Sequence, residues 1–439
     1  MKKRETNRKS GIARRRFIGA AASVAAFTIV PRCVLGGSGY AAPSEKLDIA
    51  GVGVGGRGYD DLASVGTENI VALCDVDEQR AAPAFERFPK AKKFHDFREM
   101  LDKEEKSIDA VVVATTDHTH IPISVMAMKM GKHCYCEKPM GQSIHEVRTA
   151  TEVARRYGLA TQLGTGAHAG YNYRRVVELI RAGAIGEVRE VHVWRELGED
   201  PRYRPRETPP VPPHLDWDLW LGPAPYRPYH PCYHPMHWRH WWDFGNGQLG
   251  DMGCHLLDLP FWALDLKYPT TVEAEGPPVH PEMYPRRLIV RWTFPARDDL
   301  PPVELTWYDG GKKPALLEEG DFPNWPEGVL FVGAEGMLIS EWGKHELHPR
   351  QKFAGFQRPP RTIPESIGHA EEWLAACKTG SATGCNFDYS GPLTETVLLG
   401  TVAYRVGRKL EWDPVNLKAT NCPEAEPFIR RAYREGWRL

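Results

Sequence analysis

Three residues far apart in the sequence are of the types that together carry out acid–base chemistry on a substrate oxygen. Asp251 and His255 are four positions apart, so in a helix they lie on one face, one turn from each other. Lys138 stands between Glu137 and Pro139. Imidazole transfers protons near neutral pH, and an ammonium group shielded from water stabilises negative charge on oxygen. The alternative interpretation is a surface lysine before a proline and an aspartate that caps a helix.

A glycine-rich segment near residue 50 has the composition of a phosphate-binding turn. A short apolar strand runs into Gly51, Gly53 and Gly56, which satisfy G-x-G-x-x-G. Such glycines allow a tight turn, close approach of a pyrophosphate and close packing of the following helix. A second apolar stretch, residues 70–74, ends in Asp75, 24 positions after the first glycine, where a carboxylate accepts ribose hydroxyls and repels a 2′-phosphate. The pattern predicts NAD as the cofactor, unless Asp75 is only a turn residue.

Apolar strands and helices alternate up to about residue 165. Residues 110–114 and 133–136 are continuous apolar runs typical of buried parallel strands, and a helix is expected over 122–130. Polar residues follow both strands, at 115–120 and at 137–138. Because ligands bind at the carboxyl ends of the strands in a doubly wound sheet, these two polar segments are expected to line the ligand site.

Beyond residue 165 the pattern changes to strands with one exposed face. Residues 188–194, 288–294 and 303–307 alternate apolar and polar side chains. We therefore predict an α/β chain, with an N-terminal Rossmann doubly wound parallel sheet and a C-terminal α+β domain built on a large open, mostly antiparallel sheet. The predicted segments are a Rossmann domain at 45–165, a C-terminal substrate and oligomerisation domain at 166–410 and a C-terminal arm at 411–439.

Residues 1–42 predict an export signal. The arginines at 14–16 precede an apolar run, 17–30, that is too short to span a bilayer. Small residues at Gly39 and Ala41 place the expected cleavage just after Ala41. The order Arg-Arg-x-Phe-Ile looks like a twin-arginine signal, which predicts a periplasmic or extracytoplasmic location and a mature form without membrane contact. A basic amphipathic or disordered start is the alternative.

The composition excludes several classes of protein. Hydrophobic residues make up 42% and charged residues 26% of the 439, which excludes bulk disorder, collagen and coiled coil. The formal net charge of -1 gives no electrostatic reason to bind nucleic acid or an anionic membrane. Nine cysteines, an odd number, are scattered through apolar segments and do not suggest a disulfide framework. A globular protein with a small, neutral or polar ligand is expected.

Together the motifs resemble the glucose-fructose oxidoreductase and inositol dehydrogenase family (Gfo/Idh/MocA). Over about residues 45–410, the features that carry the resemblance are Gly51-x-Gly53-x-x-Gly56, Asp75, the Glu137-Lys138-Pro139 triplet and the segment from Gly250 to Asp258. The resemblance implies that NAD or NADP is used to oxidise or reduce a hydroxyl-bearing carbon of a sugar or cyclitol. Some twin-arginine members of the family carry their cofactor out of the cytoplasm already bound.

The site residues predicted on this basis fall into three groups. His255 is the general acid/base, Lys138 polarises the reacting oxygen, and Asp251 orients the substrate or the imidazole. The predicted contacts of the NAD cofactor are Gly51, Gly53, Gly55, Gly56, Arg57, Asp75, Thr115, His120, Glu137 and Lys138. The predicted substrate contacts are His118, Trp238, His240 and Trp241.

The segment from Tyr229 to Trp242 is rich in histidine and tryptophan. Its histidines are three or four residues apart, a spacing compatible with zinc ligation. Pro231 and Pro235 interrupt any helix, no paired cysteine motif is present, and the tryptophans suit carbohydrate stacking. We therefore expect a substrate-side loop without a metal, and keep zinc as the alternative.

Three functions remain open. The leading one is an exported NAD-dependent oxidoreductase acting on a sugar, sugar derivative or cyclitol, as a homo-oligomer formed through the C-terminal sheet. The second is a glycoside hydrolase of the same fold, in which tightly held NAD oxidises a sugar hydroxyl transiently and the hydride returns. The third is a non-catalytic sugar-binding protein, which the presence of Lys138, Asp251 and His255 disfavours.

Overall fold

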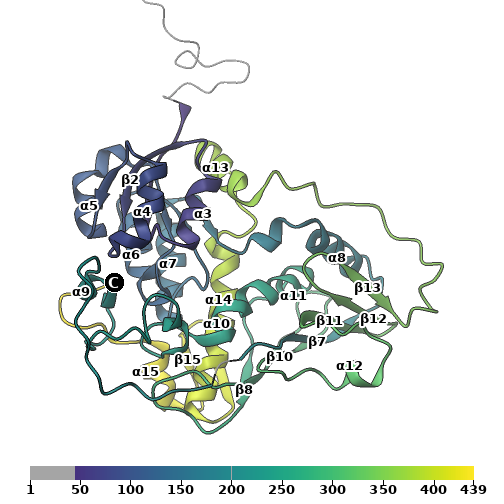
Figure 1. Cartoon of the computed structure of the whole chain (residues 1–439). Helices are drawn as coiled ribbons and strands as arrows, with labels where there is room; N and C mark the ends of the chain where they lie inside the picture. Colours follow the sequence, from purple (N-terminus) through teal and green to yellow (C-terminus); the bar gives the residue numbers. More distant parts are fainter. Residues whose placement is uncertain (1–44, 199) are drawn as a thin grey trace, which may run out of the picture. The chain divides into compact units, whose positions relative to one another are not determined.

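A computed structural model describes residues 45–198 and 200–439, so the predicted export signal lies outside the described residues (Figure 1). In the described part, no helix is long and apolar enough to cross a membrane. The element labels follow Figure 1 and start at β1 and α3.

The first half of the described chain forms a six-stranded sheet in the order β3-β2-β1-β4-β5-β6, with every neighbouring pair parallel. This confirms the predicted Rossmann-type sheet. Its strands are β1 (Asp48–Val52), β2 (Asn69–Cys74), β3 (Lys92–Phe94), β4 (Ala110–Val113), β5 (His133–Cys136) and β6 (Thr161–Leu163). Its helices are α3 (Arg57–Ser64), α4 (Glu78–Arg87), α5 (Phe97–Lys103), η2 (Glu105–Ser107), α6 (Asp117–Lys129) and α7 (Ile144–Tyr157).

Helix α6 begins five residues earlier than the sequence predicts. We expected it at Pro122, because proline favours the first turn of a helix, but Asp117 opens it. Pro122 lacks the N–H that would bond to the carbonyl of His118 four residues before it. That carbonyl instead accepts a hydrogen bond from Arg431, near the other end of the chain. A distant side chain therefore allows a helix that the local sequence alone would not predict.

The second half contains a nine-stranded sheet in the order β13-β12-β11-β7-β10-β9-β8-β14-β15. Only the β7 and β10 pair is parallel, so the predicted mostly antiparallel sheet is confirmed. Its strands are β7 (Val188–Arg195), β8 (Thr271–Glu275), β9 (Ile289–Phe294), β10 (Val303–Tyr308), β11 (Glu327–Gly333), β12 (Met337–Ser340), β13 (His345–His348), β14 (Leu410–Asp413) and β15 (Lys418–Ala419). Its helices are η3 (Gly166–Ala169), α8 (Tyr171–Arg181), α9 (Trp217–Leu221), η4 (His237–His240), α10 (Gly247–Leu256), α11 (Asp258–Ala263), α12 (Leu316–Glu319), α13 (His369–Thr379), α14 (Phe387–Val406), η5 (Pro423–Ala425) and α15 (Glu426–Ile429).

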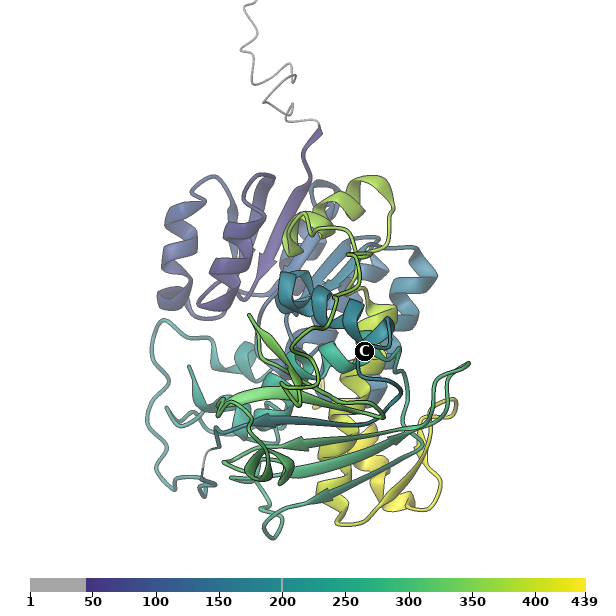
Figure 2. The same cartoon turned by 90° about the vertical axis from the view of Figure 1, so that its right-hand side faces the viewer.

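Two segments cross the domain boundaries that the sequence predicts. Helix α13 packs on the Rossmann sheet, where Trp373 and Leu374 share an apolar cluster with Ile49 and Leu73 (Figures 1 and 2). Strands β14 and β15 pair at the end of the second sheet, so the arm predicted from residue 411 begins inside that sheet. The packing of α13 and the pairing of β14 with β8 leave no local signal, because both depend on partners more than a hundred residues away.

Candidate active site

The glycine-rich turn uses a register two residues later than the one we predicted. Strand β1 ends before Gly53, whose φ of +75° favours glycine. A Cβ on Gly58 would lie 1.9 Å from the carbonyl oxygen of Gly53, so helix α3 passes this turn only with glycine there. Gly51 lies within the strand under Leu62. The sequence satisfies the motif twice, as Gly51, Gly53 and Gly56 and as Gly53, Gly55 and Gly58, and the end of the strand selects the second.

Asp75 holds this turn in place from the end of β2. Its Oδ2 accepts the backbone N–H groups of Val54 and Gly55 at 2.9 and 3.1 Å, and its Oδ1 accepts that of Asp77 at 2.9 Å. Burial raises the pKa of Asp75 even though these three donors favour the anion. A carboxylate offers about four acceptor positions, so one remains for a ligand. The predicted ribose contact stays a prediction, and the structure adds a role in shaping the turn.

A cavity of about 360 Å³ opens beside the glycine turn. Residues from both halves of the chain line it, including predicted ones (Gly53, Gly55, Gly56, Arg57, Asp75, Thr115 and Trp238) and unpredicted ones (Arg80, Phe97, Trp220, His234, Arg239 and Trp437). Glycines that admit a close backbone approach, the N-terminus of α3 and an acidic residue at the end of β2 are what a dinucleotide requires. The residues present therefore fit NAD.

Trp437 forms a wall of this cavity that the sequence did not predict. Its ring lies 6.1 Å from that of Phe97, and the Arg98 guanidinium lies over it at 4.7 Å. Arg434 anchors the arm by donating to the carbonyl of Gly222 and to Asp218, at 2.6 Å each. Figure 1 shows the end of the chain beside α9, far in sequence from the glycine turn. The only sequence signal for this wall was the aromatic and charged composition of the predicted C-terminal arm.

The structure brings Lys138 and Asp251 together. Lys138 Nζ donates to Asp251 Oδ1 at 2.6 Å, and Arg239 Nε lies 3.2 Å from the same oxygen. Burial opposes the carboxylate, but the two cations outweigh it and lower the pKa of Asp251 to about 2. Burial also opposes the ammonium, yet Asp251 and Glu137 raise the pKa of Lys138. Both groups are therefore charged at neutral pH, and Arg239 is a member that the sequence did not identify.

His255 lies one turn after Asp251 on α10, as the spacing predicts. Its ring packs edge-on against Trp342 at 6.0 Å. Burial and the nearby Lys138 charge lower the pKa of His255 to about 3. The imidazole is therefore neutral at physiological pH and has a nitrogen lone pair that accepts a proton.

Glu137 and Arg57 link the glycine turn to the Lys138 segment. Arg57 Nε lies 3.1 Å from Glu137 Oε1 and 3.0 Å from Asp61 Oδ1. Arg57 lines the cofactor cavity, as predicted for a cofactor contact, whereas Glu137 does not. A Cβ on Gly164 would lie 2.1 Å from Glu137 Oε1, so this buried carboxylate fills the space under β6. Glu137 therefore has a structural position, in which it supports Arg57 and the chain at Gly164.

Two histidines predicted to contact ligands, His118 and His120, are buried and do not line the cofactor cavity. His118 lies with its ring nitrogens 3.0 and 3.3 Å from the carbonyl oxygens of Trp220 and Phe244. His120 lies with its nitrogens 2.8 and 3.1 Å from those of Pro139 and Thr115. Burial lowers the pKa of His118 to about 3 and that of His120 to about 4, so both rings are neutral. They fix the backbone around the site.

The predicted substrate loop divides into a cavity wall and a core. Trp238 lines the cavity, and Arg239 stacks on its ring at 4.5 Å. Trp241 is buried, donates to the carbonyl of Cys232 at 3.1 Å and does not line the cofactor cavity, so its assignment to substrate stays a prediction. His240 is buried and does not line the cavity either. Aromatic residues of one loop thus line the cavity in one case and pack in the core in the other, and only the tertiary structure distinguishes the two.

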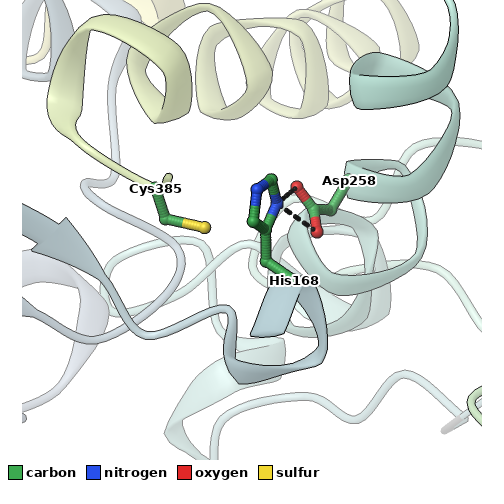
Figure 3. A group of neighbouring side chains, drawn as sticks. All are labelled: His168, Asp258 and Cys385. Atoms are coloured by element: carbon green, nitrogen blue, oxygen red, sulfur yellow. Dashed lines mark hydrogen bonds and ion pairs between the residues drawn. The ribbon is translucent and has the colours of Figure 1, made fainter. Parts of the chain in front are cut away.

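The histidines of this loop do not gather into a metal site within the part of the chain that the structure describes. His234 Nε2 instead lies 2.7 Å from Asp77, near the cofactor cavity. The one group with ligand-like spacing among the described residues is elsewhere, at His168, Asp258 and Cys385 (Figure 3). His168 Nδ1 lies 3.0 and 3.1 Å from the two Asp258 oxygens, and Tyr389 donates to Asp258 at 2.6 Å. This group is a hydrogen-bonded network inside the protein.

Two family models match the chain. One, described as the oxidoreductase family with an NAD-binding Rossmann fold, matches residues 47–165, and the C-terminal alpha/beta domain of the same oxidoreductase family matches 173–295. Together the two matches cover more than half of the chain. The protein therefore belongs to the Gfo/Idh/MocA family of oxidoreductases, and its first domain is an NAD-binding Rossmann domain.

Individual relatives match only part of the chain. A myo-inositol 2-dehydrogenase of Thermotoga maritima is 25% identical over 173 residues, which are 39% of this chain and 48% of that protein. A glycosyl hydrolase family 109 protein of Stenotrophomonas maltophilia is 29% identical over 211 residues, 43% of each chain. The chain thus spans less than half the length of these relatives.

Solved structures support the fold over a longer stretch. The WlbA dehydrogenase of Bordetella pertussis, solved with NADH and UDP-GlcNAcA, has a TM-score of 0.60 and 15% identity over 84% of this chain and 99% of that chain. GenD2 from gentamicin A biosynthesis, solved with NAD, has a TM-score of 0.58 and 20% identity over 88% and 99%. At such identities the likeness shows the fold alone.

Proposed function

We propose that this protein is an NAD-dependent oxidoreductase that acts on a hydroxyl-bearing carbon of a sugar, sugar derivative or cyclitol by hydride transfer. The observation that carries the proposal is that Arg239 belongs both to the cofactor cavity and to the ion-pair cluster of Lys138 and Asp251. Acid–base groups therefore adjoin the cavity that fits NAD. The inositol 2-dehydrogenase among the relatives supports the substrate class.

The side chains divide the chemistry between them. Bound NAD supplies the hydride acceptor. His255, neutral at physiological pH, accepts the hydroxyl proton at a ring nitrogen. The Lys138 ammonium stabilises the negative charge that develops on the same oxygen. Asp251 holds Lys138 Nζ at 2.6 Å and keeps it protonated. In the reverse direction His255 returns the proton.

The test is turnover of a panel of free sugars and cyclitols by the purified protein with added NAD, followed by NADH absorbance. We expect NADH in proportion to the sugar oxidised, or a single turnover if the cofactor cannot leave. The Lys138→Ala variant should lose this NADH formation. Saturable binding of a sugar without NADH from any member of the panel would favour a non-catalytic binding protein instead.

A redox-cycling glycoside hydrolase is the second candidate, and the family 109 glycosyl hydrolase among the relatives favours it. Such an enzyme returns the hydride to the same carbon, so glycoside cleavage should require only catalytic NAD and give no net NADH. It must also break the neighbouring C–H bond. Cleavage in heavy water should therefore place deuterium in the released sugar, and deuterium-free product would exclude this reaction.

Export by the twin-arginine pathway is part of the proposal. It rests on the sequence alone, on the arginine pair Arg14 and Arg15 before Phe17 and Ile18. Replacing both arginines with lysine should leave the precursor in the cytoplasm, because the receptor reads the pair and not only positive charge. Cell fractionation measures this. Normal export of the lysine form would indicate the general secretion route.

A homo-oligomer formed through the C-terminal sheet completes the proposal. Strands β7 and β10 lie in the middle of that sheet and carry exposed charged side chains at Arg189, Glu190 and Glu304. Light scattering after size exclusion measures the mass of the particle. A monomeric mass at all concentrations tested would contradict this part.

A further inference from the structure

Two adjoining cavities lie apart from the cofactor cavity, in the region of Trp242 and the end of α14. Their volumes are about 60 and 200 Å³, and they share the lining residues Gln142, Trp242, Arg405, Pro427, Phe428 and Arg431. Neither shares a lining residue with the cofactor cavity. They therefore form one double cavity that the proposed reaction does not use.

Arg405 presents an unpaired charge to both cavities. Its guanidinium lies over the rings of Phe428 and Trp242, at 4.1 and 4.9 Å from their centres. Among residues 45–198 and 200–439, no side chain or carbonyl forms a hydrogen bond or ion pair with it. Burial lowers the pKa of Arg405 to about 10, against the opposing charge of Asp243, so the group is still cationic at neutral pH. Arg405 is half-buried, and a cation withdrawn from water without a counterion is costly unless something compensates it.

The other charged groups around the double cavity are already compensated. The other two lining arginines have carboxylate partners, Arg431 with Glu146 and Arg227 with Asp243. The lining Glu282 pairs with Arg227 and with Arg204, which lies outside the cavity. Arg405 is therefore the charge left over in this part of the described structure.

Two further polar groups in the smaller cavity lack partners. Asn246 Nδ2 and Thr401 Oγ1 are buried, and neither has a hydrogen-bond partner in the described structure. Both residues line the same 60 Å³ space as Arg405. An amide nitrogen, a hydroxyl and a guanidinium all donate hydrogen bonds. Native proteins rarely leave one such donor unsatisfied, so two buried donors beside a guanidinium around one small space indicate a common acceptor.

We propose that the double cavity binds a small organic acid. Its carboxylate would occupy the smaller space and accept from Arg405, Asn246 and Thr401, and its body would extend into the larger one. The smaller volume is several times the roughly 10–15 Å³ that one water needs, which suits a carboxylate group. Charge-assisted bonds from a guanidinium to a carboxylate are among the strongest in proteins. The larger space has polar walls at Gln142 and Glu282, which favours a hydroxylated body.

The occupant would touch the segments that position the proposed active site. Gln142, four residues after Lys138, donates to the carbonyl of Trp242 at 2.8 Å. Asn246 precedes α10, and its carbonyl accepts the N–H of Gly250, next to Asp251. Binding should therefore stabilise the folded chain around both segments.

The experiment measures binding of sodium acetate, sodium lactate and sodium phosphate to the full-length mature protein without NAD, by calorimetry and by thermal unfolding. Sodium chloride at equal ionic strength is the control for screening. We expect acetate and lactate to bind at one saturable site and to raise Tm, with lactate the tighter because its hydroxyl reaches the larger space. Because no NAD or sugar is present, this outcome is independent of the proposed reaction.

Variants locate the site. Arg405→Gln and the nearly isosteric Thr401→Val should each weaken lactate binding at least tenfold, whereas Arg408→Gln, an exposed arginine three residues on, should not. If Arg405→Gln does not fold, Thr401→Val alone decides. Stabilisation by sodium chloride equal to that by lactate, preference for phosphate over both carboxylates, or unchanged binding in the folded variants would overturn the proposal.

Discussion

Two histidine–aspartate groups, Asp251 with His255 and Asp258 with His168, are used in opposite ways. In the first, Asp251 and Lys138 keep side-chain exposures of 22% and 14%, and the His255 ring forms no hydrogen bond to any described residue. In the second, Asp258 and His168 are 0% and 5% exposed, and Asp258 accepts from both His168 and Tyr389 (Figure 3). Both groups combine a histidine with an aspartate. Unused bonding capacity that reaches open space distinguishes a chemical site from a structural one.

If this contrast is correct, the first group should lose function without losing stability. Lys138→Ala and His255→Ala should each reduce turnover at least about a hundredfold, because acid–base and charge-stabilising groups contribute that much or more. NAD binding should survive in His255→Ala. Steady-state kinetics and calorimetric titration measure these effects, with Lys129→Ala, an exposed lysine on α6, as the control. Near-normal turnover in both variants would make this cluster structural as well.

The second group, His168 and Asp258, should lose stability without losing function. Asp258→Asn should lower the free energy of unfolding by about 3 kcal/mol, because it removes one member of a buried charged pair. Although burial opposes the charged ring, Asp258 raises the pKa of His168 well above its ordinary value. The pair therefore stabilises the fold fully below about pH 6.5 and loses this effect as the pH rises through the folded pKa.

Urea unfolding at several pH values tests this. The difference between wild type and Asp258→Asn should be largest at neutral or lower pH and should narrow at alkaline pH. Turnover per folded molecule should stay near that of the wild type. A loss of turnover without a loss of stability would place His168 and Asp258 in the site.

His118 sharpens the comparison, since it lies close to the cofactor cavity yet belongs to the structural side. His118→Phe should cost about 1–3 kcal/mol and leave the Kd for NAD unchanged. The neutral ring has one N–H, so the carbonyl that it serves, that of Trp220 or of Phe244, loses its donor. Burial lowers the pKa of His118 to about 3, so the unfolded chain binds a proton below about pH 6.5 that the folded chain does not. The stability gap should therefore shrink as the pH falls below 6.5. A weaker Kd for NAD in the folded variant would return His118 to the site.

The smallest expected effect is that of Trp437, which should change NAD binding and not stability, the reverse of His118. It faces the cofactor cavity, so Trp437→Ala should leave Tm nearly unchanged and raise the Kd for NAD about tenfold, the loss expected for one aromatic contact with a base. Isothermal titration measures it. The matched control is Trp241→Phe in the core of the same region, which should lower Tm and leave the Kd unchanged. Equal Kd values for wild type and Trp437→Ala would remove the arm from the cofactor site.

Much of the site could be predicted because its signals are local. The four-residue spacing of Asp251 and His255 needs only a helix, and the acidic residue after β2 needs only a strand that ends there. The glycine register could not be predicted, since the motif occurs twice and only the end of β1 selects Gly53, Gly55 and Gly58. The surroundings of His118 and His120 could not be predicted either. The His118 ring meets carbonyls more than a hundred residues away, and the His120 ring meets those of Pro139 and Thr115.

The sequence by itself determined the alternation that builds the parallel sheet, the period-two strands of the second sheet and the residue types of the acid–base cluster. These follow from side-chain periodicity and short-range spacing, which require no knowledge of distant partners. Only the tertiary structure decided that Arg239 completes the cluster, that Trp437 closes the cofactor cavity and that Arg405 is left without a counterion. Each of these depends on which polar atoms find partners after the chain has folded, and that is a property of packing in three dimensions.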